Sequence, residues 1–174
     1  MAKLHQIKHI DIENTYWGYS TSLWFNGCSH RCIGCWNANT WDVDETLEIP
    51  NKNVISEVLI ALDEYFPKDL TLLGGDPLAP YNVSDLSEIL NGVLSRRPKT
   101  RVLCWTGYEW EFLIKSKRHK DLLPMIDIII DGRYVQELHV DGHKYGSSNQ
   151  RIIDVKKSLE SGDLVIAPES YLGE

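Results

Sequence analysis

The sequence predicts an α/β fold with a mostly parallel sheet, arranged as a partial (incomplete) β/α barrel. Short apolar runs alternate along the chain with amphipathic stretches of helical period. The apolar runs are nearly continuous, which is typical of parallel strands that are buried on both faces. No linker or repeat divides the 174 residues, so we expect a single domain over residues 1–174. Eight β/α units need a longer chain, so the barrel should stay open along one side.

The expected strands are short runs of mainly apolar residues, and most are followed by glycine or polar residues. In chain order they cover residues 21–26, 69–73, 101–106 and 125–130, with a fifth at 164–166 and an added edge strand at 7–12. The carboxyl ends of parallel strands share one edge of a sheet, so the segments that follow these strands should meet there. These segments are 26–28, 74–77, 106–108 and 131–133.

Three helices are expected between the strands. Residues 52–66 carry apolar side chains at a spacing of three and four, and Pro67 should end this helix. Residues 84–97 form the second helix, with Ser84 as its N-cap. Residues 108–116 form the third.

The chain is acidic, with a net charge of −7 and an isoelectric point near 5.4. Such a surface does not attract polyanions, so nucleic acid is not an expected partner. The N-terminus lacks the apolar stretch of a signal peptide, and no apolar run is long enough to span a bilayer. We therefore expect a cytoplasmic protein with no membrane partner. Thiols stay reduced in that compartment, so clustered cysteines are expected to bind metal rather than form disulfides.

Three cysteines lie within eight residues, at Cys28, Cys32 and Cys35, in a C-x3-C-x2-C spacing. Three thiolates on one loop can bind three corners of a [4Fe–4S] cluster and leave the fourth iron without a protein ligand. An open metal position can bind a substrate, which is the property that separates catalytic from structural metal sites. The spacing therefore favours a cluster that does chemistry over one that only carries electrons.

Two alternatives for these cysteines remain. One is a structural zinc site with His30 or Cys104 as the fourth ligand. His30 lies inside the cysteine loop and could not easily fold back onto a shared metal, and Cys104 lies within an apolar strand, where we expect a buried small hydrophobe. The other alternative is three unrelated buried thiols, which the polar residues of the loop disfavour.

The cysteine spacing resembles the signature of the radical S-adenosylmethionine (SAM) superfamily. The usual pattern has an aromatic residue before the third cysteine, whereas here Gly34 takes that position and Trp36 follows the cysteine. With this departure the chain resembles one branch, the activating enzymes of anaerobic, class III ribonucleotide reductases. The segments that carry the resemblance occur in order at 27–37, 40–41, 74–78, 105–108, 131–134 and 146–150, within a span of about residues 10–153.

The resemblance implies a radical SAM barrel and two cofactors. The metal ligands would be Cys28, Cys32 and Cys35 of a [4Fe–4S] cluster, with S-adenosyl-L-methionine on the open iron. The SAM-binding residues would be Gly34, Cys35 and Trp36 beside the adenine, and Gly74, Gly75, Asp76 and Pro77 at the methionine end. Asp76 stands where the superfamily usually has Glu, and the glycines should let the backbone approach the ligand closely.

The same resemblance implies an activity and partners. Such activases reductively cleave SAM to generate a glycyl radical on the anaerobic ribonucleotide reductase, with a reduced flavodoxin-like or similar protein as electron donor. No side chain beyond the cluster ligands needs a catalytic role, because the cofactors carry the chemistry. Two other functions stay open: an activase of a different glycyl radical enzyme, and a non-catalytic iron–sulfur or zinc-binding module.

Other polar residues on the expected rim have open roles. Thr106, Tyr108 and Asp131 could contact SAM or the incoming glycine loop, or could serve as turn and cap residues. Residues 146–150 form either a partner-binding loop or a self-satisfied polar turn. The basic run 115–120 is expected to be a solvated helix end rather than a docking patch. The histidines expected to be solvated are His119, His139 and His143.

Overall fold

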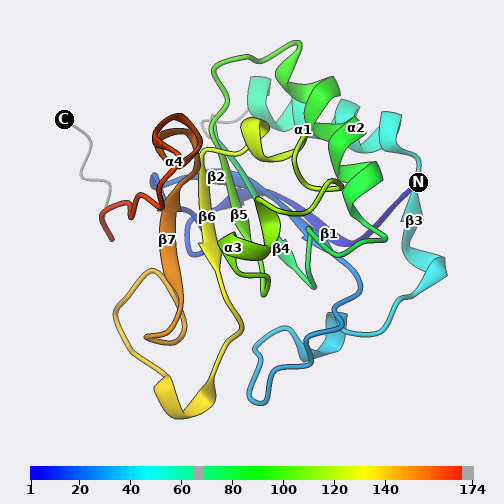
Figure 1. The fold of residues 1–174 in the computed structure, drawn as a ribbon. Helices are drawn as coiled ribbons and strands as arrows, with labels where there is room; N and C mark the ends of the chain where they lie inside the picture. Colours follow the sequence, from blue (N-terminus) through cyan, green and yellow to red (C-terminus); the bar gives the residue numbers. More distant parts are fainter. Residues whose placement is uncertain (65–68, 170–174) are drawn as a thin grey trace.

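In the computed structural model, which describes residues 1–64 and 69–169, the strands form one seven-stranded sheet (Figure 1). The strands are β1 (Ala2–Asp11), β2 (Ser20–Phe25), β3 (Glu48–Ile49), β4 (Asp69–Gly74), β5 (Val102–Trp105), β6 (Ile128–Asp131) and β7 (Arg151–Asp154). Their order across the sheet is β3-β1-β2-β4-β5-β6-β7.

The centre of the sheet is parallel and its flanks are antiparallel. Strands β2, β4, β5 and β6 run parallel, while β1 pairs antiparallel with β2 and with β3, and β7 pairs antiparallel with β6. The expected α/β fold with a mostly parallel sheet is therefore confirmed. Over the described residues the sheet is not closed, and the barrel type stays a prediction.

The helices are α1 (Asn51–Glu64), α2 (Val83–Leu94), α3 (Trp110–Leu113) and α4 (Val155–Ser161). Short 3₁₀ helices cover Ala38–Thr40, Glu45–Leu47, Leu123–Met125 and Gln136–Leu138. Within the described part of the chain, no helix combines the length and the apolar character that a bilayer crossing requires.

The larger core lies between the sheet and helices α1 and α2. Alternate side chains of the central strands point into it, with Leu23 from β2, Leu72 from β4 and Cys104 from β5 all 0% exposed. Burying a leucine of this kind contributes roughly 1.5–3 kcal/mol. The residues between them point to the opposite face, where Leu103 and Ile130 form a smaller apolar cluster. The sheet is therefore buried on both faces, which explains its continuous apolar runs.

Several element boundaries differ from the expectation. Strand β1 is longer than residues 7–12 and is second from the edge, because β3 pairs with Ala2 and Lys3. Residues 164–166 form a single bridge between Ile166 and Ile153 rather than a strand, and the flanking strand is β7. Helix α2 is capped at Asn82 instead of Ser84.

One helix is shorter than expected, and another was not expected. Helix α3 is shorter than residues 108–116, because Glu109 at its N-cap is still extended. Helix α4 was not expected, although Asp154 caps its N-terminus by accepting from the Lys157 N–H, and Gly162 ends it in a left-handed conformation. Residues 65–66 of the expected first helix, and Pro67, lie outside the described residues.

Candidate functional site

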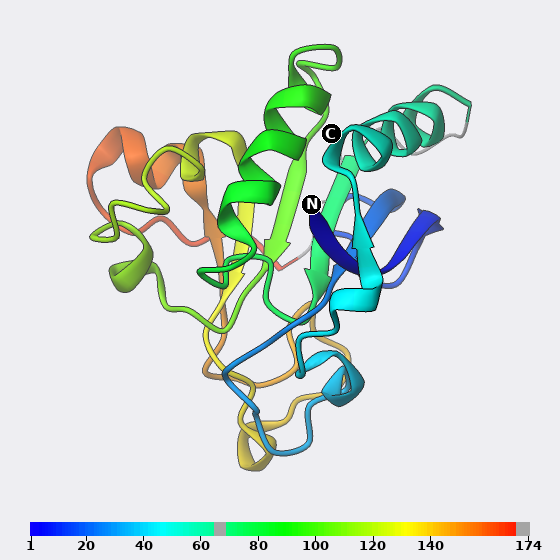
Figure 2. The same ribbon diagram turned by 90° about the vertical axis from the view of Figure 1, so that its right-hand side faces the viewer.

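The loop that contains Cys28, Cys32 and Cys35, here called the cysteine loop, follows β2 at the carboxyl end of the parallel strands. Backbone hydrogen bonds from Gly27 to Thr40 (2.7 Å) and from Cys28 to Trp41 (2.9 Å) fix its start. Both views place this loop and the long connection from β6 to β7 at the same end of the sheet (Figure 2). The loop therefore lies where ligands of parallel α/β sheets usually bind.

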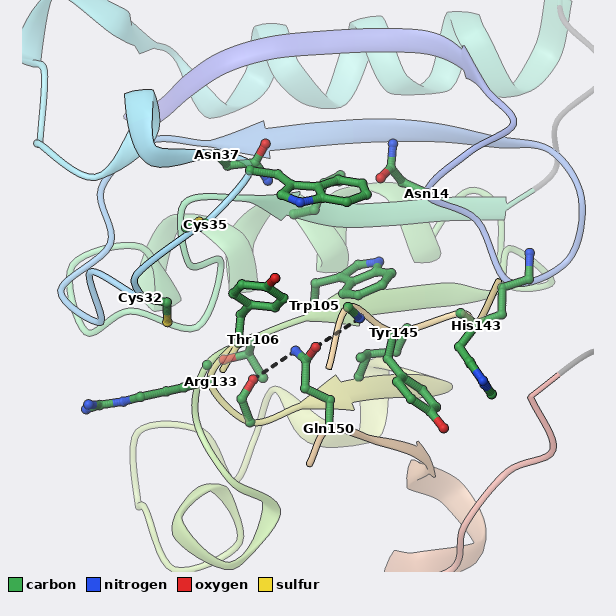
Figure 3. Close-up of a pocket in the computed structure, with 18 of the residues that line it drawn as sticks. Asn14, Cys32, Cys35, Asn37, Trp105, Thr106, Arg133, His143, Tyr145 and Gln150 are labelled. Atoms are coloured by element: carbon green, nitrogen blue, oxygen red, sulfur yellow. Dashed lines mark hydrogen bonds between the residues drawn. The ribbon is translucent and has the colours of Figure 1, made fainter. Parts of the chain in front are cut away.

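The three thiols of this loop face one cavity. Cys28, Cys32 and Cys35 are half-buried and line a hollow of about 540 Å³. Gly34, with φ of +74°, makes the sharp turn between the second and third cysteine, in a conformation that favours glycine. Figure 3 shows Cys32 and Cys35 toward one end of the cavity and His143 and Tyr145 toward the other.

The cavity gathers most of the residues that the sequence assigned to cofactors. The three cysteines are joined there by Trp36, which is 84% exposed, and by the ends of β4, β5 and β6. Of the expected SAM-binding residues, Cys35, Trp36, Gly74, Gly75 and Asp76 line it. Gly34 and Pro77 do not line it.

Asp76 is the most heavily bonded group at this rim. Its carboxylate is 1% exposed and accepts hydrogen bonds from the Thr106 hydroxyl (2.9 Å), the Gly107 N–H (3.0 Å) and the Leu78 N–H (2.9 Å). It also lies 2.9 Å from Nε2 of His30. Because protein groups already hydrogen-bond to the Asp76 carboxylate, we expect any cofactor contact from residues 74–77 to come from their backbone. Asp76 thus joins the cysteine loop to the ends of β4 and β5.

Two glycines allow this close packing. A Cβ at Gly75 would lie 2.4 Å from the carbonyl oxygen of Gly27, and a Cβ at Gly107 would lie 2.4 Å from the His30 ring. The sequence suggested that Gly75 makes room for a ligand. In the structure the backbone nearest to Gly75 belongs to the cysteine loop, and Gly75 also lines the cavity, so its contact with a ligand stays a prediction.

His30 and Cys104 do not join the cysteine thiols. Nε2 of His30 bonds Asp76, and its Nδ1 is buried without a hydrogen-bond partner among the described residues. Cys104 is 0% exposed in the core between the sheet and the helices, as expected for a small hydrophobe. In the described residues, no three His, Cys, Asp or Glu side chains are grouped closely enough to hold one metal ion.

Burial changes the acidity of the loop thiols. Burial, with a smaller effect of the Asp76 charge, raises the pKa of Cys28 to about 11. Burial also raises the pKa of Cys32, partly opposed by a backbone hydrogen bond and by the Arg133 charge. Such thiols become thiolates when iron binds and displaces their protons. Three half-buried thiols on one cavity wall are therefore a donor set that fits an iron–sulfur cluster.

The connection from β6 to β7 closes the far side of the cavity and is held by amide side chains. Oε1 of Gln150 accepts from the N–H groups of Gly146 (3.0 Å) and Ser147 (3.1 Å), and its Nε2 donates to the Gly132 carbonyl (3.0 Å) (Figure 3). Asn149 donates to the Arg133 carbonyl at 2.8 Å. These bonds favour the self-satisfied turn at residues 146–150.

The remaining rim residues take structural positions. Asp131 accepts from the Trp110 N–H at 2.8 Å and pairs with Arg151, so it anchors α3 and β7 and does not line the cavity. Thr106 lines the cavity but gives its hydroxyl to Asp76. The ring of Tyr108 packs on the edge of His30, with centroids 4.5 Å apart.

One histidine expectation was wrong. His119 is 2% exposed, with Nε2 2.8 Å from the Leu78 carbonyl and Nδ1 2.7 Å from the Ser116 hydroxyl. His139 and His143 are exposed, as expected. Sequence reasoning also did not single out Trp105 and Arg133, which line the cavity, although both lie inside the segments quoted above.

Comparisons with known proteins agree with this donor set. A family model described as "4Fe-4S single cluster domain" matches residues 17–153. Three curated relatives are each named "Anaerobic ribonucleoside-triphosphate reductase-activating protein". The one from Enterobacteria phage T4 is 34% identical over 78% of this chain and 83% of its own. The one from Vibrio cholerae serotype O1 is 34% identical over 85% and 95%, and the one from Escherichia coli strain K12 is 32% identical over 84% and 94%.

Proposed function

Because this chain belongs to the family of anaerobic ribonucleoside-triphosphate reductase-activating proteins, we propose that it activates an anaerobic ribonucleotide reductase by radical SAM chemistry. The observation that carries the proposal is the arrangement of Cys28, Cys32 and Cys35 on the wall of one cavity at the carboxyl ends of the parallel strands. Three thiols there supply three iron ligands and leave the fourth iron for SAM.

The cofactors supply the bond cleavage. When bound, the cluster and SAM would supply a one-electron reductive cleavage, with methionine, 5′-deoxyadenosine and a glycyl radical on the reductase as the products.

The chain's own residues bind and position these groups. Cys28, Cys32 and Cys35 would hold the cluster. The cavity-lining parts of residues 34–36 and of the backbone of 74–77 would contact SAM, and the protein-bonded carboxylate of Asp76 fixes the cysteine loop relative to the end of β5. No side chain on the cavity wall is assigned a proton transfer, since hydrogen-atom transfer needs neither a general acid nor a base.

The cavity must be closed while a free radical is present, because water and stray groups would otherwise react. The described sheet is open, and the cavity reaches the surface beside the exposed Trp36. We therefore propose that the reductase completes the site by inserting its glycine-bearing loop, and that this chain alone turns over SAM slowly.

The cysteines give the first prediction. Anaerobically reconstituted protein should contain about four irons with matching sulfide, as one cubane requires. With dithionite and SAM it should release methionine and 5′-deoxyadenosine. Cys28→Ala should lose both the cluster and the products, since it removes one of three ligands.

Cys104→Ala is the matched control for this experiment, because it removes a thiol that lies in the core and does not line the cavity. It should keep the cluster. Stoichiometric zinc without inorganic sulfide in freshly isolated protein would contradict the proposed function. A cluster whose spectrum does not change when SAM is added would contradict it as well.

A further inference from the structure

A concentrated positive patch lies just beyond α3 on this acidic chain. Lys115, Lys117, Arg118 and Lys120 fall within six residues and are all exposed. Among residues 1–64 and 69–169, none of the four lies within 4.0 Å of a carboxylate oxygen, although the charge of Lys115 helps to lower the pKa of the nearby Glu111. We call these four residues the basic patch. The chain as a whole has a net charge of −7, and the four cations of the basic patch give an acidic protein a place to approach it.

The segment that carries the basic patch is anchored to the rest of the protein by a buried side chain. His119 lies between Arg118 and Lys120 and is buried, and its two ring nitrogens face the Leu78 carbonyl and the Ser116 hydroxyl. Leu78 follows the Gly74–Pro77 stretch directly. The four cations therefore belong to a segment that is bonded to the residue directly after the 74–77 stretch.

A chain of aromatic contacts links the patch to the cysteine loop. Phe112 is 50% exposed and stacks on Tyr108, with ring centroids 5.1 Å apart and planes inclined by 17°. The Tyr108 ring packs edge-on against the His30 ring, with centroids 4.5 Å apart. His30 stands between Cys28 and Cys32 in the sequence. An exposed ring beside the basic patch is thus connected to the cysteine loop through packed side chains.

The proposed reaction needs an electron from outside this chain. Of its four cysteines, three are assigned to one cluster and Cys104 is buried in the core, so the chain offers no second cluster to store an electron. Electron transfer weakens steeply with distance, and a donor must therefore dock close to the cysteine loop. Neither Phe112 nor any residue of the basic patch lines the cavity, so a donor there would leave the cavity mouth free for the reductase.

We infer that the basic patch and Phe112 form the docking surface for a small acidic one-electron carrier protein, such as a flavodoxin in its hydroquinone state. The inference rests on the proposed function. One electron passes from the flavin hydroquinone, which becomes a semiquinone, to the oxidised cluster, and no bond is made between the proteins. Charge complementarity and a small aromatic contact suit such short-lived encounters.

The test compares two charge-reversed variants of the full chain. The patch variant is Lys115→Glu/Lys117→Glu/Arg118→Glu. The matched control, Lys52→Glu/Arg96→Glu/Lys99→Glu, reverses three other exposed cations away from this surface. For each protein, SAM cleavage is measured with reduced flavodoxin and with dithionite, and the ratio of the two rates is compared.

The patch variant should show a ratio at least roughly tenfold lower than the parent, and its flavodoxin-driven rate should no longer fall as ionic strength rises, because steering is lost. Calorimetry should show weaker binding of oxidised flavodoxin to the patch variant than to the control. Equal ratios in the two variants would overturn the inference, as would a patch variant that loses only reductase activation, which would assign the surface to the reductase. A parent protein that cleaves no SAM with dithionite contradicts the proposed function itself.

Discussion

Asp76 is a buried carboxylate whose partners all come from the protein. A buried charge without partners is strongly unfavourable, and here Thr106, Gly107, Leu78 and His30 supply them. The shorter side chain of Asp, compared with the usual Glu, keeps the carboxylate at the strand ends. Its effect on a cofactor is therefore positional: it sets how far the cysteine loop stands from the ends of β4 and β5.

The sequence could predict which residues meet at the rim, because strand ends of a parallel sheet converge. It could not predict which group Gly75 makes room for. A glycine that admits a ligand and one that admits a neighbouring backbone look the same in a sequence. The carbonyl of Gly27, 48 positions before Gly75 in the chain, becomes the neighbour of Gly75 only once β2 and β4 pair.

Gly75→Ala gives a prediction at this scale. Its Cβ would meet the Gly27 carbonyl at 2.4 Å, so the cysteine loop must shift. We expect a loss of roughly 1–3 kcal/mol in the free energy of unfolding, as for other overpacked sites. We also expect less iron per chain after reconstitution. Urea unfolding and iron analysis measure the two effects.

Gly92→Ala is the control for this substitution. The new methyl group would meet the Ile55 side chain, with Cδ1 at 2.5 Å and Cγ1 at 3.0 Å, and neither Gly92 nor Ile55 lines the cavity. It should leave the iron content at the parent level. If Gly75→Ala assembles a full cluster and only SAM binding suffers, the original assignment of this glycine to the ligand is correct instead.

At the scale of elements, the four parallel strands were predictable and the short flanking ones were not. Strands β2, β4, β5 and β6 are mainly apolar runs bounded by turn residues. This pattern can be recognised from the local sequence alone. Strand β3 has two residues and exists only because β1 offers it an edge. Strand β7 holds a short apolar pair, Ile152 and Ile153, that is no longer than many loop segments.

The turn from β1 to β2 depends on one buried carboxylate. Asp11 is 0% exposed and accepts from the N–H groups of Glu13 (3.0 Å) and Asn14 (3.1 Å) and from the Ser22 hydroxyl (2.8 Å). The turn it holds supplies Asn14 and Tyr16 to the cavity wall. Burial alone would raise the pKa of Asp11, but these hydrogen bonds outweigh it and the pKa is lowered from 3.8.

Asp11→Ala should therefore destabilise the protein in a pH-dependent way. A lowered folded-state pKa stabilises the protein fully above the unfolded value of 3.8, and this contribution is lost as the pH falls through the folded-state pKa. Near pH 7 we expect a loss of about 1–3 kcal/mol, which should shrink below about pH 4. Thermal unfolding of parent and variant over this pH range measures the difference.

Glu160→Ala removes an exposed carboxylate near the end of α4 and is the control. It should change stability by less than about 0.5 kcal/mol at every pH. A constant gap between parent and Asp11→Ala down to pH 3 would show that the carboxylate charge is not what holds the turn.

At the scale of the whole molecule, the residues of the basic patch do not line the cavity, and Phe112 beside the patch is linked to the cavity-lining residues His30 and Asp76 through Tyr108. The sequence showed both features separately. Their connection could not be predicted, because the ring contacts among Phe112, Tyr108 and His30, and the burial of His119, form only when the chain folds. Under the proposed function, this arrangement would let one partner deliver an electron while the reductase closes the cavity.

The proposed function requires that this chain generate a radical on a glycine of an anaerobic ribonucleotide reductase. The most direct test mixes the two proteins anaerobically with SAM and reductant and records the electron paramagnetic resonance spectrum. We predict a doublet signal from the reductase, which collapses when the reductase is made with α-deuterated glycine, because the splitting comes from the remaining α-hydrogen. A doublet with another glycyl radical enzyme and none with the reductase would contradict the account.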